Sequence, residues 1–365
     1  MPRIALFPGD GVGPEVIAEA VKVLAAVERR FGYTFTYDQF AIGGDALDRY
    51  GLPLREEDIE LTRGADAALL GAVGGPRWDA VESSLRPERG LLQIRKALAL
   101  FANLRPVTVL PALVNASPLK PEIICDVDLL IVRELTGGIY FGEPSSRWSD
   151  ATGRGAVDTL TYREHEIERV VRLAFEFARE RRGTVASVDK SNVLQSSRLW
   201  REITDEVRAD YPDVELQHVL VDAMAMHLIM NPKRFDVIVT ENMFGDILTD
   251  EASVLPGSIG LLPSASLSDQ PGSGSGTRFG LYEPIHGSAP DIAGKGKANP
   301  AGTILSAALM LRWSLGLSDA AIAVESAVAG AITSAVRTPD IVEAGIDPVT
   351  TSQFGDEVAR RVEAS

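Results

Sequence analysis

The chain has 365 residues, of which 45% are hydrophobic and 24% are charged, and its formal net charge is −15. This length suffices for about two domains, and the composition excludes a disordered, collagen-like or coiled-coil chain. The excess of acids disfavours a broad attraction to nucleic acid or to an anionic membrane, so an anionic ligand would need a local cluster of arginines.

The single cysteine and the amino-terminal sequence exclude further classes of protein. The single cysteine, Cys125, excludes an internal disulfide and a cysteine-rich metal site. The amino terminus has no apolar core behind a basic start, which predicts no signal peptide. No apolar run approaches the roughly 18 residues of a membrane span. A cytoplasmic location is therefore expected.

Short apolar runs alternate with helical spacing along the chain. Strands are predicted at residues 4–7, 67–70, 129–132, 185–188 and 237–239, with amphipathic helices at residues 14–27 and 164–182. Near-continuous apolar strands separated by helices indicate a sheet covered on both faces, which is the α/β class.

Two stretches break this alternation of strands and helices. Residues 142–155 indicate an arm or a flexible loop, and residues 264–279, with Gly-Ser-Gly-Ser-Gly, predict a mobile linker or loop.

Two acids four residues apart follow a predicted strand at residues 235–240. If a helix begins near Gly245, Asp246 and Asp250 lie on one helical face and repel each other. A divalent cation would remove that cost, and carboxylate oxygens suit Mg²⁺ or Mn²⁺. Alternatively, the two acids lie in the first turn of a helix and only stabilise the positive end of its dipole. Asp222 is either a third ligand or the N-cap of a helix that follows it.

Arginines interrupt otherwise apolar segments at Arg95, Arg105 and Arg133. Arg133 directly follows the run 129–132, and ligands of open α/β sheets bind at the carboxyl ends of strands. Because a guanidinium binds a carboxylate through two hydrogen bonds, these residues predict a hollow for an acidic substrate. The alternative is that each is an ordinary surface or salt-bridged arginine.

Two further candidates are Lys190, after the strand at 185–188, and Tyr140, in a glycine-rich turn. A lysine near cations or a metal has a lowered pKa and can act as a base. The glycines allow a ligand to approach the backbone beside Tyr140. The alternatives are a surface lysine and a core tyrosine.

A long turn-rich loop begins at His286 and leads into a helix near Pro300. Its backbone donors can wrap a nucleotide, and Asp291 can accept from an adenosine ribose, which would favour NAD over NADP. The alternative is a purely structural loop. The turn at residues 9–15 gives G-x-G-x-G followed by a proline and a glutamate, so it is predicted to be neither a Rossmann fingerprint nor a P-loop.

Together these motifs resemble the β-decarboxylating dehydrogenases, the family of isocitrate and isopropylmalate dehydrogenases. The likeness covers nearly the whole chain and rests on PGDGVGPE, LLGAVGGP, RPERGLLQIRKAL, FANLRPV, IVRELTGGIYFGEP, SVDKSNVL, VDAMAMHL, ENMFGDILTDEAS, LPSASL and EPIHGSAPDIAGKGKANP. It implies a two-domain α/β fold with a large mixed sheet flanked by helices, unlike a Rossmann fold. Residues 1–104 and 257–365 would form the first domain, with the NAD-binding loop. Residues 105–256 would form the second, with the dimer interface, the arm and the metal site.

The resemblance also implies a role for each candidate residue. The substrate site would comprise Arg95, Arg105, Arg133, Asp222, Glu88, Leu91 and Leu92, the three arginines gripping the malate carboxylates. The acid–base pair would be Tyr140 and Lys190, and the Mg²⁺ or Mn²⁺ ligands Asp222, Asp246 and Asp250. The NAD site would comprise His286, Gly287, Ser288, Ala289, Pro290, Asp291, Ile292 and Asn299. Lys190 and Asp222 would come from the neighbouring subunit, so that a homodimer shares its active sites.

The expected reaction is the NAD-dependent oxidative decarboxylation of (2R,3S)-3-isopropylmalate to 4-methyl-2-oxopentanoate and CO₂ in leucine biosynthesis. Leu91 and Leu92 would offer an apolar wall to the isopropyl group. A missing methylene changes binding by only ~1–3 kcal/mol, whereas burying a third carboxylate against two leucines costs far more, so isocitrate is disfavoured. Dehydrogenases of tartrate, D-malate or homoisocitrate, and a catalytically silent metal- and nucleotide-binding scaffold, are the alternatives.

Overall fold

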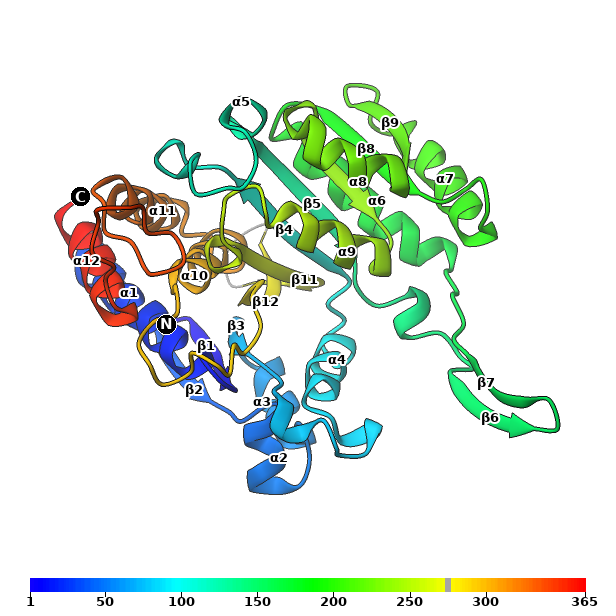
Figure 1. The fold of residues 1–365 in the computed structure, drawn as a ribbon, viewed down its shortest axis with the longest axis horizontal. Helices are drawn as coiled ribbons and strands as arrows, with labels where there is room; N and C mark the ends of the chain where they lie inside the picture. Colours follow the sequence, from blue (N-terminus) through cyan, green and yellow to red (C-terminus); the bar gives the residue numbers. More distant parts are fainter. Residues whose placement is uncertain (273–276) are drawn as a thin grey trace. The chain divides into compact units, whose positions relative to one another are not determined.

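A computed structural model describes residues 1–272 and 277–365, which divide into two compact units. The first unit comprises Met1–Leu100, Val109–Lys120 and Pro256–Ser365, and the second comprises Phe101–Thr108 and Pro121–Leu255. Each unit contains a mixed sheet flanked by helices, which confirms the predicted α/β class (Figure 1). The domain boundaries implied by the resemblance stay a prediction. In neither of the described ranges is there a helix both long and apolar enough to cross a bilayer.

The first unit has the strand order β2-β1-β3-β12-β11. β1 pairs in parallel with β2 and β3, β12 is parallel to β3, and β11 is antiparallel to β12. The strands are β1 Arg3–Gly9, β2 Thr36–Gln39, β3 Ala67–Ala72, β11 Pro263–Pro271 and β12 Arg278–Pro284. Every residue of β3 is buried, as expected for a strand with both faces covered.

Helices cover this sheet, and the first and last of them lie side by side (Figure 1). They are α1 Gly13–Phe31, α2 Gly44–Tyr50, α3 Glu56–Arg63, α4 Pro87–Ala97, α10 Ala301–Trp313, α11 Ser318–Thr333 and α12 Thr351–Ala364. α10 packs against β11 and β12 and is buried along almost its whole length, which its nearly continuous apolar sequence permits. Between α1 and α12, a Cβ on Gly355 would meet Glu19 Oε2 at 1.9 Å, so glycine is what allows this close packing.

The second unit has the strand order β4-β5-β10-β8-β9. β4 is antiparallel to β5, and the other pairs are parallel. The strands are β4 Ala102–Thr108, β5 Asp128–Glu134, β8 Thr184–Asp189, β9 Glu215–Leu220 and β10 Val237–Thr240, and the helices are α5 Pro121–Ile124, α6 Glu164–Arg179, α7 Gln195–Arg208, α8 Val221–Met230 and α9 Asn242–Ala252. Short 3₁₀ turns include η4 Gly138–Tyr140.

A two-stranded hairpin occupies the stretch for which an arm or a flexible loop was predicted. β6 Ser146–Asp150 pairs with β7 Gly153–Val157, and the hairpin projects away from the rest of the second unit (Figure 1). All five residues of β6 are exposed, including Trp148. The stretch is therefore a regular arm.

Two predicted helix starts are wrong. α9 begins at Asn242 rather than near Gly245, because the side chain of Glu241 caps it by accepting hydrogen bonds from the amides of Met243 and Phe244 at 3.2 and 2.8 Å. α8 begins at Val221, so Asp222 lies in the first helical turn and is not an N-cap.

The prediction of a mobile loop at residues 264–279 is also wrong at both ends. β11 and β12 form an antiparallel pair there, and Ser264, Ser266 and Ser268 are buried within it. The small serine side chains fit into a sheet that is covered on both faces. The same serine-rich composition is typical of a flexible linker, which is why the prediction failed. The remainder of the predicted loop, residues 273–276, lies outside the described residues.

Candidate active site

The carboxyl ends of β5 and β10 lie next to each other, because Thr240 is in register with Arg133. Arg133, the last but one residue of β5, is 3% exposed, and its NH1 forms an ion pair with Asp246 Oδ1 of α9. Gly245 makes this approach possible, because a Cβ there would be 2.6 Å from Arg133 Cγ. The strand end and the helix therefore place a buried guanidinium directly against a carboxylate.

Arg105 of β4 adds a second buried guanidinium to this group. Its NH2 lies 3.9 Å from Asp246 Oδ1, and its NH1 lies 3.8 Å from Asp250 Oδ1. Two neutral side chains fix its position: Nε donates to Asn103 Oδ1 at 2.7 Å and NH1 donates to Thr249 Oγ1 at 2.6 Å. The predicted arginines of the second unit thus share one place with two of the three predicted metal ligands.

Tyr140 completes the group. Its Oη donates a hydrogen bond to Asp246 Oδ2 at 3.0 Å, and the guanidinium carbon of Arg133 lies 5.8 Å from its ring centroid. Burial and the neighbouring Asp246 carboxylate raise the pKa of Tyr140, so the phenol keeps its proton at neutral pH. A protonated phenol in this position can donate a proton to a ligand.

The two acids of α9 have different electrostatic surroundings. Burial alone would raise the pKa of Asp246, but Arg133 and Arg105 hold it below its ordinary value. Burial raises the pKa of Asp250, an effect that Arg105 opposes and Asp246 reinforces. The side chain of Asp250 is 70% exposed and open to a ligand. Two carboxylates one turn apart, one partly buried and one exposed, suit a hard divalent cation.

Lys190 and Asp222 form a separate pair in the second unit. Lys190 follows β8, and its Nζ lies 2.5 Å from Asp222 Oδ1 on α8. The hydrogen bond from Lys190 lowers the pKa of Asp222. In the part of the chain that the structure describes, no three His, Cys, Asp or Glu side chains come close enough together to hold a metal ion.

The first unit carries the remaining predicted substrate residues on α4. Glu88, Leu91, Leu92 and Arg95 recur at helical spacing and so share one face, with both leucines half-buried and Glu88 exposed. Arg95 is 8% exposed, and its NH2 donates to Glu283 Oε1 at 2.6 Å. Its Nε is buried without a hydrogen-bond partner, which leaves one donor available to a ligand.

The loop from His286 to Ile292 rests on the amino-terminal turn. The amide of Val12 donates to the carbonyl of Ser288 at 2.8 Å, and a Cβ on Gly11 would lie 1.9 Å from that oxygen. Val12, Val16 and Ala298 pack together, with Ala289 and Ile292 against them. The glycine-rich turn after β1 therefore supports this loop.

His286 offers an unsatisfied atom within the loop. Its Nδ1 lies 2.9 Å from the carbonyl of Gly287, which places the proton on Nδ1 and leaves Nε2 as an acceptor. Nε2 is buried without a partner, and burial lowers the pKa of His286. Asn299 is held by Asp340 at 3.0 Å and by the amide of Ala301 at 3.0 Å, and Asp291 is exposed. An orphaned acceptor beside backbone donors fits a nucleotide.

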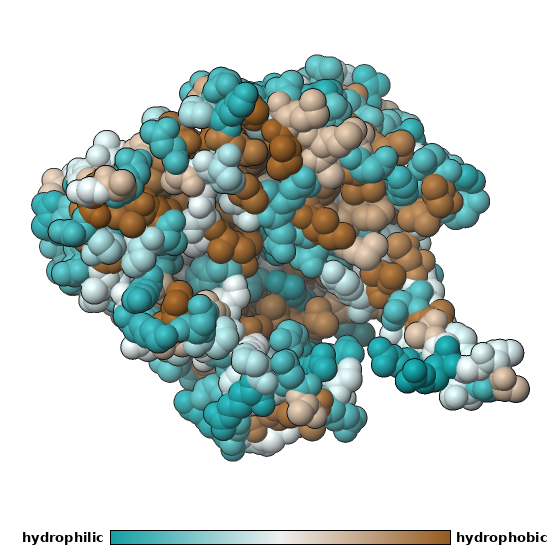
Figure 2. All heavy atoms as spheres, viewed as in Figure 1, coloured by the Kyte–Doolittle hydropathy of each residue, from teal (hydrophilic) through white to brown (hydrophobic). Residues whose placement is uncertain are grey.

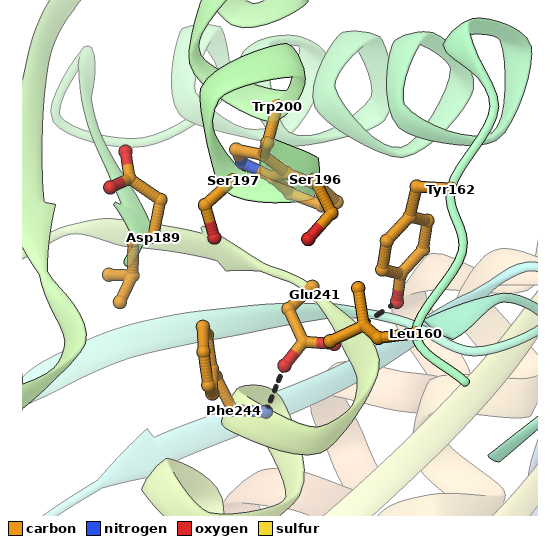
Figure 3. Close-up of a pocket in the computed structure, with 9 residues that line it drawn as sticks. Leu160, Tyr162, Asp189, Ser196, Ser197, Trp200, Glu241 and Phe244 are labelled. Atoms are coloured by element: carbon orange, nitrogen blue, oxygen red, sulfur yellow. Dashed lines mark hydrogen bonds between the residues drawn. The ribbon is translucent and has the colours of Figure 1, made fainter. Parts of the chain in front are cut away.

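Four residues of this region were missed from the sequence: Glu134, Tyr162, Glu241 and Asn242. They form a buried hydrogen-bond cluster behind the Arg105–Arg133 group, part of which is seen in Figure 3. Glu134 ends the buried strand β5, and Glu241 directly follows β10. Their positions at the ends of buried strands could have identified them as candidates from the sequence. Asn242 lies within the motif ENMFGDILTDEAS, in which only the aspartates were interpreted as functional residues.

Comparisons with known proteins agree with this fold. Residues 3–358 match the sequence model of a family described as isocitrate/isopropylmalate dehydrogenase. The chain is 58% identical over 356 residues to a 3-isopropylmalate dehydrogenase of Shouchella clausii, covering 98% of this chain and 96% of that protein. It is 58% identical over 361 residues to the enzyme of the same name from Carboxydothermus hydrogenoformans, covering 99% and 94%.

Two solved structures share the architecture over the whole chain. The isocitrate dehydrogenase of Methylococcus capsulatus is 35% identical, with a TM-score of 0.86 and full coverage of both chains. A β-decarboxylating dehydrogenase of Thermococcus kodakarensis is 36% identical, with a TM-score of 0.79 and coverage of 100% and 97%. The fold expected from the sequence is confirmed.

Proposed function

The chain belongs to the isocitrate/isopropylmalate dehydrogenase family, and we propose that it catalyses the NAD-dependent oxidative decarboxylation of (2R,3S)-3-isopropylmalate to 4-methyl-2-oxopentanoate and CO₂ in leucine biosynthesis. The observation that carries this proposal is the full-length identity of 58% to 3-isopropylmalate dehydrogenases, combined with two buried guanidinium groups beside the carboxylates of Asp246 and Asp250. A diacid substrate is the ligand that such a group suits best.

Substrate binding is assigned to the three arginines and to α4. Arg105 and Arg133 are already desolvated and held by neighbouring side chains, so they bind a carboxylate without further ordering cost. The unpartnered Nε of Arg95 adds a third donor. Leu91 and Leu92 supply the half-buried apolar surface for an isopropyl group, which a third carboxylate cannot share without a large desolvation cost.

Asp246 and Asp250, with Asp222 of a second copy, would hold Mg²⁺ or Mn²⁺, and the 286–292 loop with Asn299 would hold NAD. When bound, the cation lowers the pKa of the substrate hydroxyl and stabilises the enolate, while NAD supplies the two-electron acceptor. Lys190, in its neutral amine form, would accept the hydroxyl proton at Nζ. Tyr140 donates a proton from Oη to the enol carbon, in keeping with its raised pKa.

An exposed apolar face on α8 and α9 supports a homodimer. Met226 and Met230 are 58% and 70% exposed, and they lie on the face of α8 that bears Asp222. Ile247, 59% exposed, is three residues from Asp250 on α9. Figure 2 shows hydrophobic side chains over these helices. A second copy seated there would cover this surface and bring its Lys190–Asp222 pair toward the Asp246–Asp250 pair.

Absorbance at 340 nm tests the proposal directly. The purified protein is mixed with NAD, Mg²⁺ and, in turn, 3-isopropylmalate, isocitrate, D-malate, tartrate and homoisocitrate. A rise that is fastest with 3-isopropylmalate supports the assignment, whereas a faster rise with another diacid reassigns the substrate. No rise with any diacid would leave a binding protein without dehydrogenase activity. The cytoplasmic location expected from the sequence stays a prediction.

A further inference from the structure

Asn242 joins two parts of the proposed active site through one side chain. It is the first residue of α9 and is 1% exposed. Its Oδ1 accepts hydrogen bonds from Arg133 Nε at 3.1 Å and NH2 at 2.8 Å, and its Nδ2 donates to the carbonyl of Gly137 at 3.0 Å. A guanidinium only donates and a carbonyl only accepts, so the amide has one orientation that satisfies both.

The carbonyl of Gly137 belongs to the turn that carries Tyr140. On one side, the amide of Gly137 donates to Glu134 Oε2 at 2.8 Å. On the other, Gly138 has a φ of +76° and packs so closely that a Cβ would be 2.5 Å from Tyr162 Oη. The turn η4 follows at once, so a displacement of Gly137 is passed to the phenol two residues beyond Gly138.

A second layer holds the backbone of Asn242. Its amide donates to Tyr162 Oη at 2.9 Å, and this hydroxyl lies 3.1 Å from Glu134 Oε2 and 3.3 Å from Glu241 Oε2. The Tyr162 ring meets Trp200 edge-on, with centroids 5.8 Å apart. In Figure 3 Tyr162 and Glu241 both line a small pocket, and Glu241 also caps α9. Hydrogen bonds therefore tie the start of α9 to the carboxyl ends of both β5 and β10.

We propose that Asn242 is a positioning residue, which sets the spacing between the Arg133 guanidinium and the Tyr140 phenol. Through Oδ1 it orients the group that binds a substrate carboxylate, and through Nδ2 it anchors the turn of the proton donor. This inference rests on the proposed function for the roles of Arg133 and Tyr140. Two groups that act on one small substrate require such a link, because a misplacement of about 1 Å can lower a rate about 100-fold.

Two substitutions separate the two halves of this role. Asn242→Asp keeps two oxygen acceptors for Arg133 but has no donor for the Gly137 carbonyl. Asn242→Ala removes both contacts. Thr204→Val is the matched control: Thr204 is fully buried in the same unit, and its hydroxyl donates only within α7 to the carbonyl of Trp200 at 2.7 Å and lies 3.5 Å from Ser187.

Steady-state kinetics and amide hydrogen exchange are measured for all four proteins. In Asn242→Asp we expect kcat to fall by about 10- to 100-fold with a smaller change in the KM for 3-isopropylmalate, and the amides of Gly137 and Gly138 to exchange faster. In Asn242→Ala both kcat and KM worsen. In Thr204→Val the melting temperature falls, while kcat, KM and the exchange of this turn stay as in the unmodified protein.

Hydrogen exchange also separates this inference from the proposed function, because it needs no substrate. If the unmodified protein does not oxidise 3-isopropylmalate, the proposed function fails, but faster exchange of the Gly137 and Gly138 amides in the Asn242 variants still supports the structural link. Unchanged exchange at this turn in both Asn242 variants would overturn the inference. So would kinetics in which both variants behave like Thr204→Val.

Discussion

Tyr140 and Asp246 are joined by one hydrogen bond, in which the phenolic Oη donates to Oδ2 at 3.0 Å. The other oxygen of the same carboxylate is paired with Arg133. Asp246 thus bonds both to the Tyr140 phenol, which is the proposed proton donor, and to the Arg133 guanidinium, which suits a substrate carboxylate. A change at either partner alters the surroundings of the acid that would hold the metal.

Tyr140→Phe keeps the ring beside Arg133 but removes the proton that the phenol would give to the enol. We expect the formation of 4-methyl-2-oxopentanoate to fall by about 10²- to 10⁴-fold, while the reduction of NAD in a single turnover survives better. Rapid mixing that follows absorbance at 340 nm, with quenching to measure the keto acid, separates the two steps. Equal loss of both would contradict the assignment.

Lys190→Met removes the amine at nearly constant side-chain length. NADH formation should be abolished, because nothing then accepts the hydroxyl proton at that position. The variant should remain folded, since Lys190 is partly exposed and its ion pair is with Asp222, an exposed residue. Circular dichroism checks the fold and absorbance checks the rate. A fully active variant would remove Lys190 as the base.

Asp250→Asn should weaken Mn²⁺ binding at least about tenfold, because an amide replaces an exposed carboxylate that a hard cation prefers. Isothermal titration calorimetry measures the affinity directly. Glu251→Gln is the matched control, since the next helical residue points about 100° away from Asp250. If both variants bind Mn²⁺ alike, Asp250 is not a ligand.

Acid should destabilise the protein through His286. Burial lowers its pKa from an ordinary value of 6.5, so below that pH the unfolded chain binds more protons than the folded chain. Stability is therefore lost as the pH falls below about 6.5 and through the lowered pKa of His286, by about 1.4 kcal/mol for each unit by which the pKa is lowered. The melting temperature of His286→Gln should fall less over this range. An identical fall in both proteins would exclude His286 as the cause.

The sequence predicted those features that depend on local pattern. Apolar runs placed β1, β3, β5, β8 and β10, and motif letters singled out residues that the structure gathers, such as Arg105, Arg133 and Asp246. The start of α9 was misplaced because the cap is a glutamate, whereas the usual N-cap residues are Ser, Thr, Asp and Asn. Composition also failed at β11, where serines that are typical of a loop lie buried in a sheet.

The cluster around Tyr162 could not be found from spacing. Its members are Glu134, Tyr162, Glu241 and Asn242, which lie as many as 108 positions apart in the chain before the sheet brings them together. Pairings of this kind depend on which strands become neighbours, and no periodicity within one segment encodes that order. Glycines are similarly hard to interpret from sequence: Gly245 lies within helix α9, where it leaves room for Arg133 of β5.

The support of the 286–292 loop by the amino-terminal turn also ties that loop to both ends of the chain. Val12, which bonds to Ser288, immediately precedes α1, and α1 is locked against α12 by Gly355 and by an ion pair of 2.7 Å between Lys22 and Asp356. A ligand that stiffens the loop would also damp the motion of these terminal helices. A fluorophore attached beside Ser365 would then signal nucleotide occupancy from a site remote from the chemistry.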